Sequence, residues 1–100
     1  MFTFTITIGL ESPQLTPEEC RQFALISAGK FFPEGHSIID LTGRWLSPSR
    51  GIVDEPSLQI IVIGDDSIRE NVLAFCNTYK AGCFQDCVLL QVSQPETHWL

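Results

Sequence analysis

The chain has 100 residues, of which 44% are hydrophobic and 18% are charged. This composition is enough for one hydrophobic core, so we expect a single domain over residues 1–100. The 12 acidic residues outnumber the 6 Lys and Arg residues, which gives a formal net charge of -6. Because the few cations are scattered along the sequence, we expect binding neither to nucleic acid nor to an anionic membrane surface.

The first third of the chain predicts a strand followed by a helix. Residues 2–8 alternate between apolar side chains and threonines, which is typical of a half-buried strand. Thr16 and Glu19 then form a capping-box pattern, with Pro17 at the first helical position. A helix should therefore begin at this point, and the Pro-Glu-Gly sequence at 33–35 should end it.

The remainder predicts two strands, a second helix and a last strand. Residues 37–46 form the expected second strand, and the more apolar residues 58–63 form the third. Ser67 and Glu70 make a second capping-box pattern, so a helix should open at Ser67, and residues 87–92 should form the last strand. The order β-α-β-β-α-β predicts an α+β, ferredoxin-like fold. In it, a four-stranded antiparallel sheet carries two helices on one face.

The sheet face turned away from the helices is expected to be half apolar. On the second strand, we assign Ile39 and Leu41 to the helix side and Ile38 and Asp40 to this open face. A monomer seldom leaves such a face in water, so we expect a homodimer or one wall of a ligand pocket. The candidate interface residues are Ile61, Ile63 and Leu89.

Residues 42–57, TGRWLSPSRGIVDEPS, predict a hairpin arm that projects from the sheet between the second and third strands. The Ser-Pro-Ser-Arg-Gly sequence supplies the proline and glycine of a tight turn. Arg44 should then lie opposite Asp54 or Glu55, with Trp45 as a buried anchor. Pro56 has no N–H for a sheet ladder, so we expect the pairing to break or bulge there.

A pocket beneath the arm is the candidate ligand site. The charged groups of Asp40, Arg44 and Glu55 would meet there under Trp45, above a floor of threonine hydroxyls. An ion-paired hairpin held by its tryptophan explains the same residues without a ligand, and it is the preferred interpretation. The candidate ligand-binding residues are Asp40, Arg44, Trp45, Glu55, Thr3, Thr5 and Thr7.

The stretch FFPEGHSIIDLTGRWLSPSRGIVDEPSLQIIVI and the later FQDCVLLQVSQP also carry a resemblance. The Phe-Pro-Glu-Gly turn, the Gly-x-Trp hairpin and the Glu-Pro-Ser return are similar to those of a bacterial family of small proteins classed as a domain of unknown function. The resemblance runs from about Thr7 to Pro95. It implies one domain with the hairpin arm, and it supplies no mechanism.

The sequence predicts no metal site, no cofactor and no disulfide. Cys76, Cys83 and Cys87 are spaced unlike Cys-x-x-Cys metal knuckles, and Cys20 lies on an apolar helix stripe, so we expect reduced thiols. His36 should be a surface or capping residue. The first residues lack the pattern of a secretory signal, and no apolar run approaches the ~18 residues of a membrane helix. We therefore expect a cytoplasmic protein.

Three functions fit this reading. A non-catalytic small-ligand-binding or regulatory module, acting as a homodimer, comes first because no catalytic signature is present, and the balance is against an enzyme. The alternatives are an enzyme of the dimeric α/β-barrel type with a pocket on the open sheet face, and an accessory protein that binds another protein through the arm. The fold alone does not rank them, because this architecture hosts unrelated functions.

Overall fold

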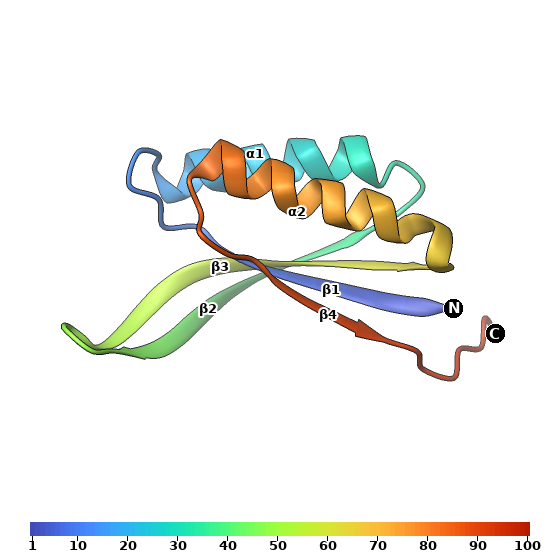
Figure 1. The fold of residues 1–100 in the computed structure, drawn as a ribbon. Helices are drawn as coiled ribbons and strands as arrows, with labels where there is room; N and C mark the ends of the chain where they lie inside the picture. The colour runs from blue at the N-terminus through green and yellow to red at the C-terminus, as the bar shows by residue number, and fades with distance from the viewer.

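The computed structural model describes all residues from 1 to 100 and has the predicted order of elements. Two helices cover one face of a four-stranded antiparallel sheet, whose strand order is β2-β3-β1-β4, as Figure 1 shows. The predicted ferredoxin-like α+β fold is confirmed. The elements are β1 (Phe2–Gly9), α1 (Pro17–Phe31), β2 (Ser37–Ser47), β3 (Gly51–Gly64), the 3-10 turn η1 (Asp66–Ile68), α2 (Arg69–Cys83) and β4 (Leu89–Ser93).

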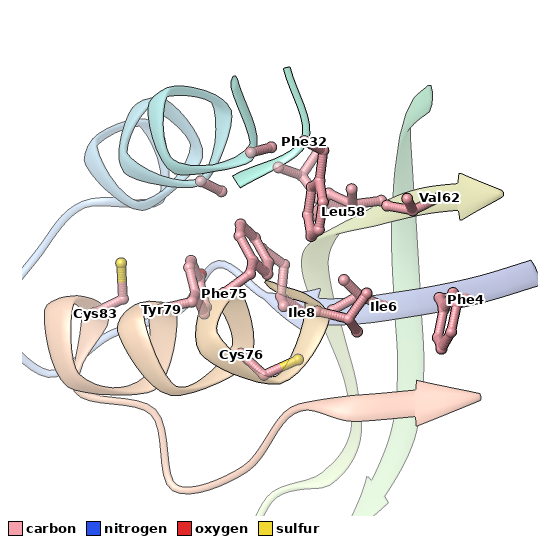
Figure 2. Close-up of a cluster of buried hydrophobic side chains, with 14 of the residues drawn as sticks. Phe4, Ile6, Ile8, Phe32, Leu58, Val62, Phe75, Cys76, Tyr79 and Cys83 are labelled. Carbon is pink, nitrogen blue, oxygen red and sulfur yellow. The ribbon is translucent and has the colours of Figure 1, made fainter. Parts of the chain in front are cut away.

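The core lies between the sheet and the helices (Figure 2). The alternation in β1 buries Phe4, Ile6 and Ile8, because every second side chain of a strand points to the same face. Phe75 and Tyr79 of α2 are fully buried above them. The core therefore consists of large apolar side chains from both layers, with no disulfide.

The first predicted helix cap is confirmed and the second is wrong. Thr16 Oγ1 accepts a 3.1 Å hydrogen bond from the Glu19 N–H, and Glu19 Oε1 accepts one of 3.0 Å from the Thr16 N–H. No such pair forms between Ser67 and Glu70. Instead Asp65 has the extended backbone of an N-cap and accepts from the Ser67 N–H at 2.9 Å, so a 3-10 turn precedes α2.

The predicted faces of β2 are reversed. Ile38 pairs with the buried Ile60 of β3, so Ile38 and Asp40 lie on the helix side, and Ile39 lies on the open face. The physical reason is the register with β3, which places Asp40 opposite the buried Leu58. The Arg21 guanidinium of α1 accommodates the Asp40 carboxylate there with two bonds, at 2.9 and 3.1 Å. An edge strand can therefore turn a carboxylate toward a helix.

The expected break at Pro56 is also wrong, because β3 runs without interruption through this residue. In an antiparallel strand the N–H and C=O of one residue point to the same neighbour. The Pro56 carbonyl points to the β1 side, where it accepts a 2.9 Å bond from the Leu10 N–H. The missing N–H would therefore also have faced β1, and the ladder between β2 and β3 loses nothing at Thr42, which pairs with Pro56.

The arm, residues 42–56, extends past the end of β1 and makes the molecule elongated, with principal extents of 46 × 25 × 20 Å (Figure 1). Its turn is closed by Ser47 Oγ, which accepts from the N–H groups of Ser49 and Arg50 at 3.3 Å. Gly51 has a φ of +74°, which favours glycine. Trp45 is 45% exposed, so the expectation of a buried anchor is wrong.

Neither helix is long and apolar enough to cross a membrane.

Candidate functional site

The structure does not bring the predicted charged cluster together. Asp40 is paired with Arg21 on the helix side. The Arg44 guanidinium donates to the Asp54 carboxylate at 2.7 and 3.1 Å. Of the two partners expected from the sequence, Asp54 and Glu55, the structure therefore has Asp54. Glu55 folds over Gly9, where it occupies the space that a Cβ would need. The three residues thus have three separate environments.

The remaining predicted site residues lie on the open sheet face. Thr3, Thr5 and Thr7 pair with β3 on one side and β4 on the other, and Thr7 accepts a 3.2 Å bond from the Gln59 amide. Trp45 lies along the arm opposite Val53. No pocket opens beneath the arm, because the structure's one pocket is at the other end of the sheet.

That pocket has a volume of about 750 Å³ and lies where α1 turns into β2. Its walls come from residues 31–37 at the end of α1, residues 61–65 at the end of β3, and the start of α2. Trp99, close to the C-terminus, completes it. The cavity therefore draws on segments that are far apart in the sequence.

His36 is the one histidine among the pocket-lining residues, and a hydrogen bond orients its ring. His36 Nδ1 lies 3.0 Å from the carbonyl oxygen of Phe32. Because a carbonyl oxygen only accepts, Nδ1 carries the hydrogen, and in the neutral ring Nε2 is left with a free lone pair. The half-buried His36 lines the pocket, and the lone pair of its Nε2 can act as a hydrogen-bond acceptor or a base.

Two carboxylates give the pocket a negative character. Asp65 accepts from both the N–H and the hydroxyl of Ser67, and these hydrogen bonds hold the pKa of its carboxyl below the ordinary value. Glu34 lies in the turn on the opposite wall. No Lys or Arg lines the cavity, and the Met1 ammonium, which also lowers the pKa of Asp65, is the one cation among the lining residues. Two carboxylates against one ammonium leave the cavity slightly negative, which favours a cationic ligand over an anionic one.

The apolar walls are built on a rigid frame. The end of α1 is closed by the Asn71 amide, which donates to the Phe31 carbonyl at 3.0 Å. The Phe32 ring packs against Phe75 in the core with the ring centroids 5.6 Å apart. Ile61 and Ile63 also line the pocket, as does Trp99, which is 75% exposed. A flat apolar group with a positive charge fits this combination.

No group of three His, Cys, Asp or Glu side chains is placed to hold a metal ion. Of the four cysteines, which are all free, only Cys87 is exposed. Burial and hydrogen bonding with Cys20 raise the pKa of the Cys83 thiol to about 12, so this thiol is protonated at neutral pH.

Sequence reasoning missed this pocket. It assigned His36 a surface or capping role, and the contact of His36 with the carbonyl of Phe32 at the end of α1 is such a capping role, but it does not describe the cavity beside it. The available signal was the sequence FPEGHS, in which a glycine turn is followed at once by a histidine at a strand start. Gly35 has a φ of +153°, and this turn brings His36 back against the end of its own helix.

No protein-family model matches the sequence, and no curated protein sequence matches it. Solved structures do match the fold. A phage SAM lyase in complex with S-methyl-5′-thioadenosine is 19% identical and has a TM-score of 0.65, over 93% of this chain and 80% of the lyase chain. CutA from Synechococcus elongatus PCC7942, complexed with Bis-Tris, is 15% identical with a TM-score of 0.55, over 94% and 78% of the two chains. At these identities the likeness shows the fold.

The likeness corrects the preferred function from the sequence. A non-catalytic module was placed first because the expected architecture came without a catalytic signature. Two structures of the phage SAM lyase match, one with its ligand and one in the apo state, and this lyase is an enzyme with the same architecture. The match contradicts the preference for a non-catalytic module. The resemblance to the bacterial family of small proteins stays a prediction.

Proposed function

We propose that the chain is an enzyme that binds a small adenosine-type sulfonium compound, of the class of S-adenosylmethionine, in the pocket beside His36. The observation that carries the proposal is the composition of this pocket: two carboxylates against one ammonium, that of Met1, together with an oriented histidine and aromatic walls. The fold likeness to a SAM lyase supports an enzymatic role, and the pocket supports the class of ligand.

The ligand chemistry matches the pocket group by group. A sulfonium is a permanent cation, which Glu34 and Asp65 would attract across the cavity. A nucleoside offers a flat ring for the apolar wall and hydroxyls for polar groups such as Ser67 and Asn71. A volume of about 750 Å³ is within the usual range of small-ligand sites.

The proposed reaction is an elimination that cleaves a carbon–sulfur bond. His36 Nε2 accepts a proton from the carbon next to the one bonded to sulfur, and the carbon–hydrogen electron pair forms a double bond. The carbon–sulfur bond breaks, and its electron pair goes to the sulfur, which leaves as a neutral thioether. Neither water nor an oxidant is consumed, which is the definition of a lyase.

The test is to incubate the purified protein with S-adenosylmethionine and to follow the release of S-methyl-5′-thioadenosine by mass spectrometry. We expect release by the wild type and a loss of about 10²-fold or more in His36→Gln, which keeps a polar side chain but removes the base. The matched control is His98→Gln, because His98 is exposed and pairs with Glu96 outside the pocket. An inactive wild type, or equal loss in both variants, would contradict the proposal.

We also propose that the protein self-associates through the open sheet face, in the cytoplasm. Ile63 and Leu89 are 48% and 54% exposed on this face, and Ile61 lies beside them. The four free cysteines support a reducing compartment. Analytical ultracentrifugation should give a homodimer that Leu89→Asp weakens, and a monomer at millimolar concentration would contradict self-association.

A further inference from the structure

The edge of β3 beside the pocket has no strand next to it. β2 begins at Ser37, which pairs with Ile61, whereas β3 continues to Gly64. On the other side, β1 follows β3 to its end, because Phe2 pairs with Gly64. The last three residues of β3 therefore have a neighbouring strand on one side only, and their free side lines the pocket.

Ile63 directs its backbone N–H and C=O into this gap. Successive residues of an antiparallel strand point these groups to opposite neighbours. Pro56 points to β1, so Ile61 and Ile63, at odd separations from it, point to the β2 side. Ile61 has Ser37 as its partner there. The position opposite Ile63 is Gly35, whose N–H is donated to the Phe32 carbonyl at 3.3 Å instead.

The main chain of Ile63 thus offers a hydrogen-bond donor and an acceptor side by side, with no partner for either in the hydrogen bonds of the chain. Polar backbone groups are strong hydrogen-bonding groups that need either water or a partner. Here they face a cavity that the exposed Trp99 also lines. A planar ligand that presents an acceptor next to a donor would satisfy both and could stack on the indole.

We propose that this part of the pocket recognises an adenine ring. The ring nitrogen N1 accepts from the Ile63 N–H, the N6 amino group donates to the Ile63 C=O, and the Trp99 indole stacks on the ring face. The inference rests on the proposed function and deepens it, because it names the part of the ligand that the end of β3 reads. It also assigns roles to two residues that take no part in the chemistry at His36.

Adenine is favoured over other bases by the order of its groups. Adenine presents an amino donor beside a ring-nitrogen acceptor, whereas hypoxanthine presents a carbonyl acceptor beside a ring N–H. A double methylation at N6 removes the donor and leaves the ring. Stacking on an aromatic side chain adds to the binding free energy of any base, and it adds more when the ring is large and flat.

The first experiment uses amide NMR with adenosine as the probe, without any turnover. We expect the Ile63 amide proton to shift downfield on titration, because it exchanges water for a ring nitrogen. The Ile61 amide, already in the ladder with Ser37, is the internal control and should move much less. We expect N6,N6-dimethyladenosine, which loses one hydrogen bond, to bind about tenfold more weakly than adenosine. Inosine, whose donor and acceptor are both reversed, should bind more weakly still.

The second experiment isolates the stacking residue. The chain has two tryptophans, so Trp45→Phe leaves Trp99 as the only one, and its fluorescence should change on adenosine binding. Trp99→Ala in the wild type should weaken adenosine binding about 5-fold or more, and Trp99→Phe should restore most of it. Both variants should melt like the wild type, since the side chain is exposed.

The outcomes separate the inference from the proposed function. Adenosine binding with the Ile63 shift but no turnover of S-adenosylmethionine would overturn the proposed reaction and leave the adenine site standing. Turnover with an unchanged Ile63 amide, or with equal affinity for adenosine and inosine, would overturn the adenine site alone. No adenosine binding at millimolar concentration would overturn it as well.

Discussion

The Tyr79 hydroxyl of α2 donates a 2.6 Å hydrogen bond to the carbonyl oxygen of Gly9, the last residue of β1. This bond joins the helix layer to the sheet at the base of the arm. Tyr79 is fully buried, and burial raises the pKa of its hydroxyl far above the ordinary value of 10. The hydroxyl therefore remains protonated, and a hydrogen-bond donor, at neutral pH.

Tyr79→Phe should lower the free energy of unfolding by about 1–3 kcal/mol, because it leaves the part-buried Gly9 carbonyl without its partner and adds no cavity of note. Urea denaturation at neutral pH measures this. Phe84→Leu is a suitable control, since Phe84 is 49% exposed at the end of the same helix, and its loss should be much smaller. Equal stability of Tyr79→Phe and the wild type would contradict the role of the bond.

The two aromatic residues Phe75 and Trp45 should differ sharply in their effect on stability. Phe75 is fully buried, so Phe75→Ala should cost about 3–5 kcal/mol through lost burial and a cavity. Trp45→Ala should cost only a small part of that, because nearly half of its side chain is already in water on the arm. Thermal melts of both variants compare them, and a loss at Trp45 as large as that at Phe75 would contradict the exposed arm.

Asp40 should contribute to the acid sensitivity of the fold. The hydrogen bonds from Arg21 hold the pKa of its carboxyl below the ordinary 3.8. A carboxyl with a depressed pKa in the folded state gives stability that is present above the unfolded pKa and lost as the pH falls through the folded one. The stability difference between wild type and Asp40→Asn should therefore shrink from about pH 4 downward.

The control for this pH dependence is Asp86→Asn, an exposed carboxyl outside the four ion pairs of the structure. Its stability difference from the wild type should not change in the same window. Melting temperatures measured from pH 6 to pH 2 provide the comparison. A constant difference for Asp40→Asn across this range would show that Arg21 gives Asp40 no preference for the ionised form.

A thiol reagent should label one cysteine per chain under native conditions. Cys87 is exposed, whereas Cys20, Cys76 and Cys83 are buried, and burial raises the pKa of the Cys76 and Cys83 thiols. Cys87→Ser should therefore abolish fast labelling, and denaturation should release three further thiols. Fast labelling of Cys83 in the native protein would contradict its burial at the end of α2.

The sequence predicted what is set locally and missed what is set between distant segments. The alternation of β1 and the Thr16 capping box involve neighbours in the chain, and both are confirmed. The faces of β2 follow from its register with β3, in which Ile38 lies opposite the buried Ile60, so the apolar pattern of Ile38 and Ile39 alone could not decide them. Local chemistry is visible in a sequence, whereas register and ion pairs between layers follow only from the packed fold.

The candidate site could not be predicted for the same reason, because it joins segments that are distant in the sequence. Gly35, Ile63 and Trp99 line one cavity, yet nothing in their local sequence relates them. The cavity exists because β2 starts at Ser37 while β3 continues to Gly64, and the relative start of two strands is a property of the sheet. The charged pattern of the arm was easier to see, and it belongs to a hairpin with the exposed Arg44–Asp54 pair.

The most direct test of the account is a calorimetric titration with S-methyl-5′-thioadenosine. Ser37→Trp would fill the pocket with a side chain at an exposed strand start, and Ser93→Trp places the same ring at the opposite edge of the sheet, in β4. We expect one binding event per chain in the wild type, its loss in Ser37→Trp and its retention in Ser93→Trp. No binding to the wild type, or undiminished binding to a folded Ser37→Trp, would contradict the account.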